Sequence, residues 1–477
     1  MAVSADNRYE WKLTQDGCWE RDIDEAEEFY TSLEKAYEGT GRVFFAITGV
    51  PGSVFDTTIP PLPPGYNMTR PSEGTRRSMR PLPTVHRSAS GQMRPFRSCR
   101  RECPGWTGAM PTPPVPALST LFLIRAPVTD DQVFRADLVL RAHHDIIDGM
   151  GTLLLLHNLF TLAADAHGQV SYELPQFGDE WSNLSPPLRR AAEIPAALSP
   201  EQEGDLREIL EFNSALKRGV EIASPPFRRH IALPGKHQRV AITLPEGTTA
   251  RLLAKCRTLG LSVTHAYHAS IALAVGTLQE CRETERTLRY VNYCLINERH
   301  HCKDPYSTPA HPASVYRSVS GRCLSIDLTV PALGSPSQTA MAEDIFLPVA
   351  EHVRDYYLEI RNNEEHIKLV PAYWGMSILP RPESEPPAIP SRNETPSASI
   401  SSMGMLDKVI RHQYGIFNVD NPWVTGEELG TGLGFFLGTW KGRLTLSAAY
   451  NEAWHGKEEV LDALKRCNDI VFQGLGL

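Results

Sequence analysis

One run of residues, 134-FRADLVLRA-142, constrains the fold most strongly because its apolar residues alternate. Every second residue of this run is apolar, which is the pattern of a strand with one face turned to a core. The strand leads into 143-HHDIIDGMGT-152, and an apolar segment at 152–166 with the length of a helix follows. The sequence therefore predicts a strand, a Gly-containing turn and a helix in succession, with two adjacent histidines at the turn.

Other segments of the chain predict a mixture of strands and helices. Further strands are expected at 42–50, 117–126, 238–244 and 288–297, and a β-hairpin at 434–450 that turns at Lys441-Gly442. Further helices are expected at 20–36, which reads as exposed and acidic, and at 203–219, 248–260, 264–278 and 349–361, with Ser262 or Thr264 as the cap of the helix at 264–278. These elements lack the regular alternation of a doubly wound sheet, so we expect an α+β or layered α/β fold. The length of 477 residues suggests two or three domains.

Residues 51–116 differ in composition from the rest of the chain. They hold 14 of the 38 prolines, and 70–101 contains nine arginines against one acidic residue. We find neither helical nor strand periodicity there, so an atypical, disordered or loosely packed insertion is expected. A basic docking segment and an error in the gene model are the alternatives. We also expect a linker at 183–206 and a surface loop at 379–399.

Charge, hydropathy and cysteine usage exclude several classes of protein. The net charge of −8 and the pI of about 6.1 argue against a chain built to bind nucleic acid or anionic membranes. No apolar run has the length of a membrane span, and the N-terminus does not resemble a signal peptide. The nine scattered cysteines fit a reducing compartment better than a disulfide framework. We therefore expect a cytoplasmic protein.

The paired histidines allow two chemistries. If the strand continues, His144 shares a face with Leu138 and Leu140 while His143 points to the other face, so the rings diverge and cannot easily share a metal ion. A helical turn would instead bring His144 and Asp148 together as metal ligands. A zinc site would need a third protein ligand, which 300-HHC-302 could supply, although nothing in the spacing requires it. We expect no metal. His144 is either a satisfied core residue or a general base at the edge of a cleft.

Two readings of the residues that follow also stay open. Asp148 could orient His144, or it could hold the turn through a basic partner. Gly149 and Gly151 give the turn backbone conformations that are closed to other residues.

The run His143-His144-x-x-x-Asp148-Gly149 matches the HHxxxDG motif, and the chain resembles the chloramphenicol-acetyltransferase-like superfamily. That group includes the BAHD acyltransferases, the condensation domains of nonribosomal peptide synthesis and fungal O-acetyltransferases. The segment 292-NYCLINER-299 is similar to their Asn-x-Arg strand, and 400-ISSMGMLD-407 to their Ser-x-x-Gly segment. The region 438–451 looks most like trichothecene O-acetyltransferases. The resemblance covers most of the chain except 51–116, where such relatives carry an apolar, Trp-containing helix.

The resemblance implies two chloramphenicol-acetyltransferase-like α/β (α+β) subdomains, 1–205 and 206–477, each a mixed sheet with helices, around a central channel. It implies that His144 takes a proton from an acceptor hydroxyl as that oxygen attacks the thioester of acetyl-CoA or another acyl-CoA. It further implies a structural ion pair between Asp148 and Arg299, with His143 and Gly149 supporting the motif. Ser401 or Ser402 is the candidate oxyanion donor, and Asn297 either contacts substrate or satisfies backbone groups.

The same resemblance implies which partners the chain has. The co-substrate is an acyl-CoA, the acceptor is a small-molecule alcohol of secondary metabolism, and no bound cofactor or metal is needed. We expect a monomer that binds neither nucleic acid nor membrane. Two alternatives remain: a freestanding condensation enzyme that forms an amide from a carrier-protein thioester, and a non-catalytic relative that binds a hydrophobic product in the channel.

Overall fold

A computed structural model describes residues 7–15, 17–36, 42–51, 96–100, 119–125, 135–169, 180–230, 234–335, 338–378, 389–428 and 430–477. Most of 51–116 lies outside these ranges, so the expectations for that segment stay untested. Within it, however, Phe96–Arg100 forms the strand β4, which pairs in parallel with β5, Thr120–Arg125. The sequence predicted no strand there, because five residues are too few for an alternation to stand out.

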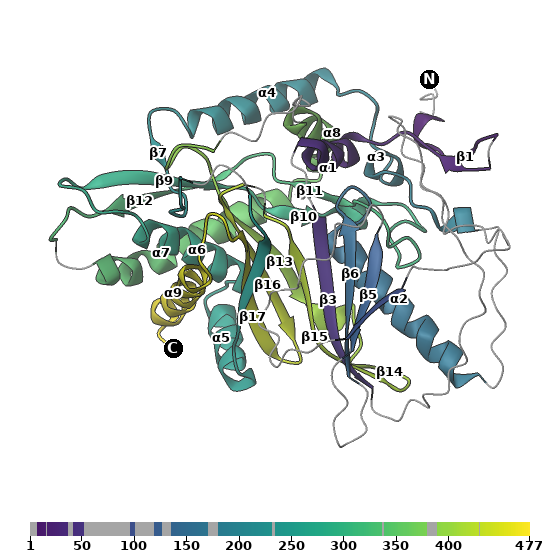
Figure 1. Ribbon diagram of the computed structural model, residues 1–477. Helices are drawn as coiled ribbons and strands as arrows, with labels where there is room; N and C mark the ends of the chain where they lie inside the picture. The colour runs from purple at the N-terminus through teal and green to yellow at the C-terminus, as the bar shows by residue number, and fades with distance from the viewer. Residues whose placement is uncertain are drawn as a thin grey trace.

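A six-stranded sheet contains the strand that leads to the paired histidines (Figure 1). Its order is β14-β15-β3-β6-β5-β4, with β3 at Arg42–Pro51, β6 at Ala136–His143, β14 at Gln413–Tyr414 and β15 at Phe417–Gly426. The strands predicted at 42–50, 117–126 and 134–142 are thus confirmed. Two strands at one edge of the sheet, β14 and β15, come from the second half of the chain, so the two halves share this sheet.

The alternation in β6 has the expected structural consequence. Leu140 and Ala142 lie in a core cluster with Leu153 and Leu156 of helix α2, Gly149–Gly168. On the opposite face of the strand, Val139 packs with Phe122 of β5. Each face of β6 is therefore buried, and α2 covers the one that carries the even-numbered residues.

A second, four-stranded sheet has the order β13-β16-β17-β8, with strands Ala398–Met405, Leu433–Trp440, Arg443–Asn451 and His237–Thr243. The hairpin between β16 and β17 turns at Lys441 and Gly442, whose φ angles are 47° and 69°. Two positive φ angles are those of a type I′ turn, which matches the twist of a hairpin. The predicted hairpin and its turn are confirmed.

Helices pack against this sheet to form the largest core cluster among the described residues. They are α5 at Glu246–Thr258, α6 at Val263–Thr277, α7 at Gln338–Arg361 and α9 at Lys457–Leu475. Ser262 caps α6: its hydroxyl accepts from the His265 amide at 3.2 Å, and the His265 Nδ1 accepts from the Ser262 amide at 3.1 Å. Helix α7 begins eleven residues before the predicted 349, and α9 was not predicted.

The remaining described strands form smaller sheets. A three-stranded sheet has the order β12-β9-β7, and two pairs are β10–β11 and β1–β2. Their bounds are Leu324–Val330, Arg286–Asn292, Glu221–Ile222, Leu295–Asn297, Arg317–Val319, Lys12–Leu13 and Trp19–Glu20. The single strand predicted at 288–297 is therefore two strands. The chain leaves β9 at Asn292, whose side chain accepts from the next amide, that of Tyr293, and donates to the carbonyl of Ala398.

The expectation of a linker at 183–206 was wrong. The segment contains helix α3, Leu188–Ala191, and the start of α4, Pro200–Ala215. Helix α4 begins early because Pro200 occupies its first turn and Ser199 with Gln202 forms a capping box. The other helical bounds are Glu25–Ala36 for α1, His366–Ser377 for α8, and the 3₁₀ helices Asn7–Tyr9, Glu180–Asn183, Glu298–His301 (η3) and Leu406–Lys408.

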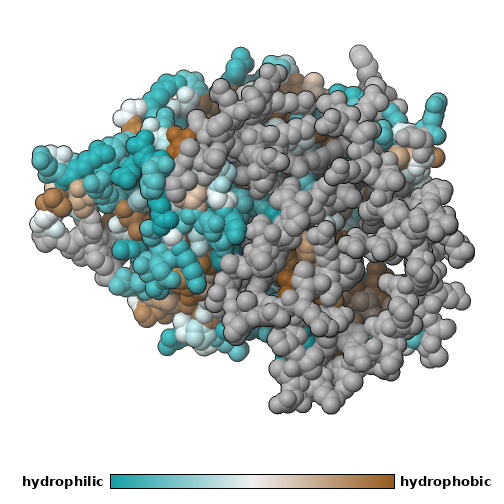
Figure 2. Space-filling model, in the orientation of Figure 1, coloured by the Kyte–Doolittle hydropathy of each residue, from teal (hydrophilic) through white to brown (hydrophobic). Residues whose placement is uncertain are grey.

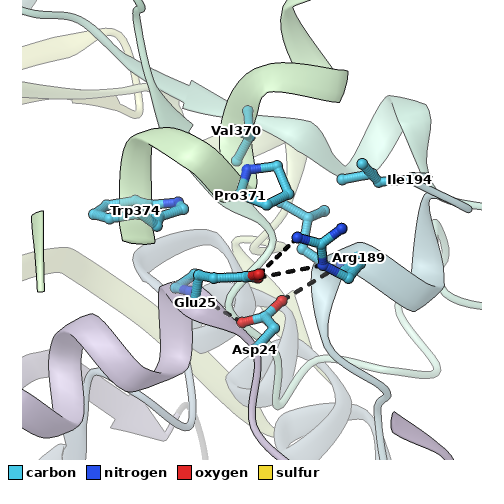
Figure 3. A pocket seen from close by; sticks show the side chains of 9 residues that line it. Asp24, Glu25, Arg189, Ile194, Val370, Pro371 and Trp374 are labelled. Atoms are coloured by element: carbon cyan, nitrogen blue, oxygen red, sulfur yellow. Dashed lines mark hydrogen bonds and ion pairs between the residues drawn. The ribbon is translucent and has the colours of Figure 1, made fainter. Parts of the chain in front are cut away.

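Helix α1 is not the exposed acidic helix that its sequence suggested, because it packs against α8 (Figure 1). Tyr30 is buried in a cluster with Trp374 of α8. The acidic residues near the start of α1 pair with arginines. Glu27 lies 2.6 Å from Arg21. Figure 3 shows the second pair, Glu25 with Arg189, which are 2.6 Å apart. The acidic residues of α1 therefore did not predict its solvent exposure correctly.

The surface of the described residues is mainly polar on the face drawn in Figure 2, with scattered apolar side chains around the second sheet and its helices. No helix in the described part of the chain combines the length and apolar character needed to cross a membrane.

Candidate active site

The paired histidines lie where β6 ends and the turn before α2 begins. His143 is the last residue of β6 and pairs in register with Arg42 of β3. His144 is the first residue of the turn. The strand therefore ends one residue before His144, and its alternation does not fix the direction of that side chain. The side chain of His143 is buried and that of His144 is half-buried, which places the two imidazoles in different surroundings.

The tautomer of His144 follows from one hydrogen bond. Its Nδ1 lies 3.1 Å from the carbonyl oxygen of Ile147. A carbonyl oxygen can only accept, so the proton of the neutral ring is on Nδ1 and the lone pair is on Nε2. Burial lowers the pKa of His144, while the negative charge of Asp148 opposes that shift. The ring is therefore a neutral imidazole with Nε2 able to take a proton.

An aromatic side chain holds the plane of this imidazole. The ring of Tyr30, from α1, stacks on that of His144 with centroids 4.1 Å apart and planes 22° apart. On Tyr30 in turn lies the guanidinium of Arg317, 5.0 Å from the ring centre, and burial lowers the pKa of Arg317 to about 10. Sequence reasoning missed Tyr30 because it lies on another element 114 residues away. The aromatic pair Phe29-Tyr30 in an otherwise acidic helix was the only available signal.

Asp148 caps helix α2 and joins the two halves of the chain. Its Oδ1 accepts from the amide of Gly151 at 2.7 Å, and its Oδ2 accepts from Nη1 of Arg299 and from the amide of Tyr316, both at 2.9 Å. These three bonds satisfy the carboxylate, and none of them goes to His144. Asp148 and Arg299 are 2% and 6% exposed, so this is a buried ion pair.

Arg299 is held by further polar groups. Its Nη2 donates to the hydroxyl of Ser314 at 3.1 Å, and its Nη1 to Oδ1 of Asn297 at 3.2 Å. The same Asn297 oxygen accepts from the amide of Arg299 and caps η3. The predicted Asn297 and Arg299 thus lie together with Asp148, and Asn297 is engaged with Arg299.

The second glycine after Asp148 leaves room for this ion pair. A Cβ on Gly151 would lie 2.2 Å from the carbonyl oxygen of Pro312 and 3.0 Å from Nη2 of Arg299. The backbone of the other half therefore approaches the first turn of α2 more closely than any side chain would allow.

Strand β13 brings the predicted serines to the edge of the same region. Met403 is an extra residue in the pairing of β13 with β16, a β-bulge, and its Cε would lie 3.2 Å from a Cβ on Gly149. The hydroxyl of Ser402 shares a hydrogen bond of 2.8 Å with Thr264, and that of Ser401 lies 3.7 Å from the sulfur of Met403. Both hydroxyls thus point to residues other than His144 in these contacts, and their role as oxyanion donors stays a prediction.

Comparisons with known proteins place this geometry in context. No family model matches the chain. The acetyltransferase pigO of Monascus ruber is 23% identical over 372 residues, which are 76% of this chain and 73% of that protein. The O-acetyltransferase pigM of the same organism is 24% identical over 329 residues, 67% of this chain and 58% of that protein. The matched part of the chain thus spans less than two thirds of pigM.

Solved structures show the fold. The trichothecene 15-O-acetyltransferase TRI3 of Fusarium sporotrichioides superposes with a TM-score of 0.69 at 14% identity and covers 99% of this chain and 100% of its own. The first condensation domain of the CDA synthetase superposes with a TM-score of 0.59 at 13% identity, with 96% of each chain covered. The resemblance drawn from the sequence is confirmed, and so is the α/β (α+β) fold class. The chain has the fold shared by the condensation domains and the fungal trichothecene O-acetyltransferase.

Proposed function

We propose that this protein is an acyl-CoA-dependent O-acyltransferase that acetylates a hydroxyl group of a secondary metabolite, with His144 as general base. Two of the sequence relatives are an acetyltransferase and an O-acetyltransferase, and the superposed TRI3 is a 15-O-acetyltransferase. The observation that carries the proposal is the hydrogen bond from Nδ1 of His144 to the carbonyl of Ile147, because it leaves Nε2 as the proton acceptor.

The reaction follows from this tautomer. Nε2 takes the proton of the acceptor hydroxyl while the oxygen forms a bond to the thioester carbonyl carbon. The carbon–sulfur bond of the tetrahedral intermediate then breaks, and the proton on Nε2 goes to the departing CoA thiolate. No covalent acyl-enzyme is required. General-base catalysis of this kind contributes typically about 10²–10⁴-fold.

Other residues support His144 in the proposed mechanism. Tyr30 holds the plane of the imidazole, and its aromatic face stabilises the imidazolium that forms after proton transfer. Asp148 fixes the turn rather than the ring, since its hydrogen bonds go to Gly151, Arg299 and Tyr316. A hydroxyl from Ser401 or Ser402 is proposed to donate to the oxyanion.

The same proposal includes the partners and organisation of the chain. It takes acetyl-CoA or another acyl-CoA as co-substrate and a small-molecule alcohol as acceptor, and it needs no resident cofactor or metal. We propose a cytoplasmic monomer with subdomains at 1–205 and 206–477, in which β14 and β15 cross over to complete the first sheet.

A second candidate rests on the shared fold. The CDA condensation domain superposes over nearly the whole chain. A freestanding enzyme of that type would attack a carrier-protein thioester with an amine, and the same His144 would serve as base. The third reading, a non-catalytic relative, depended on residues 51–116, which the structure leaves largely undescribed.

One assay separates these functions. The purified chain is incubated with labelled acetyl-CoA and a panel of terpenoid, polyketide and alkaloid alcohols, and products are identified by mass. A parallel reaction offers an acetyl thioester on a carrier protein together with amines. Ester formation from acetyl-CoA is expected, with a loss of about 10²–10⁴-fold in His144→Ala and in His144→Gln, whose amide cannot act as a base. Amide formation from the carrier alone would establish the second candidate, and no product in either arm would support the non-catalytic reading.

A further inference from the structure

A buried glutamate in η3 has one carboxylate oxygen without a hydrogen-bond donor. Glu298 is 0% exposed. Its Oε1 accepts from the hydroxyl of Ser318 and lies 3.6 Å from Nε2 of His366. No donor lies within hydrogen-bond distance of its Oε2 among the described residues, and Nε2 of the His301 imidazole lies 3.7 Å away. A buried carboxylate oxygen left in this state needs a cation.

Two histidines of the same short helix surround that oxygen. The rings of His300 and His301 have centroids 4.0 Å apart. Nδ1 of His300 lies 3.0 Å from the carbonyl oxygen of Asn297, so the proton is on Nδ1 and the lone pair is on Nε2. One potential ligand atom from each of Glu298, His300 and His301 lies within 4.8 Å of the others.

We propose that Glu298, His300 and His301 form a binding site for a divalent transition metal, with zinc as the best match. Two imidazole nitrogens and one carboxylate oxygen are a common zinc donor set, with a water in the fourth position. Zinc–ligand bonds of about 2.0–2.2 Å require the three atoms to approach one another. The exposed side chain of His300 and the half-exposed one of His301 leave them free to close the site.

The surroundings of the three side chains resemble the outer shell of metal sites. His300 donates its other ring nitrogen to a backbone carbonyl, and Ser318 with His366 holds the second oxygen of Glu298. Such outer hydrogen bonds orient metal ligands and fix their tautomers. The neighbouring Cys302 is not a ligand, because its thiol faces the backbone carbonyl of Glu298 at 3.6 Å.

The site lies beside the ion pair that joins the two halves. Arg299, the residue between Glu298 and His300, donates to Asp148, and Asn297 caps the same helix. A metal ion bound to η3 would restrict the motion of this segment and raise the free energy of unfolding of the chain. The inference does not depend on the proposed acyl transfer.

A metal titration tests the site directly. The full chain is freed of metal with a chelator and titrated with Co²⁺, followed by the visible absorption of bound cobalt, and with Zn²⁺, followed by calorimetry and thermal unfolding. One equivalent is expected to bind, with a tetrahedral cobalt spectrum and a rise in Tm.

Variants assign the binding to these residues. Saturable binding and the zinc-dependent rise in Tm should be lost in His301→Ala and in His300→Ala. Both should persist in the matched control His352→Ala, an exposed histidine of α7 whose Nε2 faces the carbonyl of Ser325 at 3.1 Å. Absence of saturable binding in the parent chain, or equal binding in the parent and both histidine variants, would overturn the proposal.

Discussion

The ion pair between Asp148 and Arg299 allows a quantitative test of how the two halves of the chain are joined. Asp148→Asn keeps one oxygen, which can still accept from the amide of Gly151. Its new amide group, however, would face Nη1 of Arg299 and the amide of Tyr316, both 2.9 Å from the present Oδ2. The amide N–H groups introduced by Asp148→Asn would then face two other donors, Nη1 of Arg299 and the Tyr316 amide, with no acceptor between them. The buried guanidinium of Arg299 would also lose its counter-charge.

The expected cost follows from burial. Removing one partner of a buried ion pair typically destabilises a protein by about 3–5 kcal/mol. Asp148→Asn should lie within this range. Arg299→Ala should lie near its lower end, because two backbone amides would still donate to the Asp148 carboxylate. The double variant should cost less than the sum of the singles, with a coupling energy of about 0.5–3 kcal/mol.

Urea unfolding of the four proteins in this cycle measures the coupling, and turnover is measured in parallel. Arg289→Ala serves as the matched control, because its ion pair with Asp327 is 2.6 Å long but joins side chains that are 25% and 54% exposed, and it should cost about 0–1 kcal/mol. Strict additivity would exclude Arg299 as the partner that matters. Normal unfolding of Asp148→Asn combined with lost turnover would show instead that Asp148 orients His144 in catalysis.

Three further predictions concern the base, a buried carboxyl and a close approach of the backbone. His144→Ala should lower kcat by about 10²–10⁴-fold while His143→Ala is affected much less, and equal mild losses would remove His144 as the base. Protonation of His144 disables the base, and burial lowers the pKa of this histidine. The midpoint of the acid limb in the pH profile of kcat/KM should therefore lie below the ordinary histidine pKa of about 6.5. Burial raises the pKa of Asp24 to about 7, so its protonated form favours the folded state; this contribution is present below the unfolded pKa near 3.8 and lost as pH rises through 7. Thermal unfolding should therefore show Tm falling as pH rises from about 4 to 7 and levelling off above 7, and Asp24→Asn should flatten that dependence; an unchanged slope would contradict it. Gly151→Ala should destabilise the chain strongly in urea unfolding, whereas Gly247→Ala, which meets no atom within 4 Å in helix α5, should be neutral or stabilising.

Local interactions explain why several elements could be predicted from the residues. The alternation in β6, the Ser262 cap of α6 and the Lys441-Gly442 turn depend on neighbours in the sequence, so short-range periodicity and turn chemistry suffice. The HHxxxDG run also identified the fold through its resemblance. The assignment of His144 and the serines to catalysis stays a prediction, which the variants above test.

Tertiary structure alone decided features that depend on contacts distant in the chain. Helix α1 reads as exposed from its charges, yet arginines outside the helix neutralise it and allow Tyr30 to reach His144. The crossing of β15 into the first sheet carries no local signal, since its pairing with β3 joins segments more than 350 residues apart. The sequence by itself determined the strand, turn and helix around the paired histidines, because periodicity is a property of neighbouring residues. What surrounds those histidines was decided by packing between elements, whose energy depends on side chains that approach only in the folded chain.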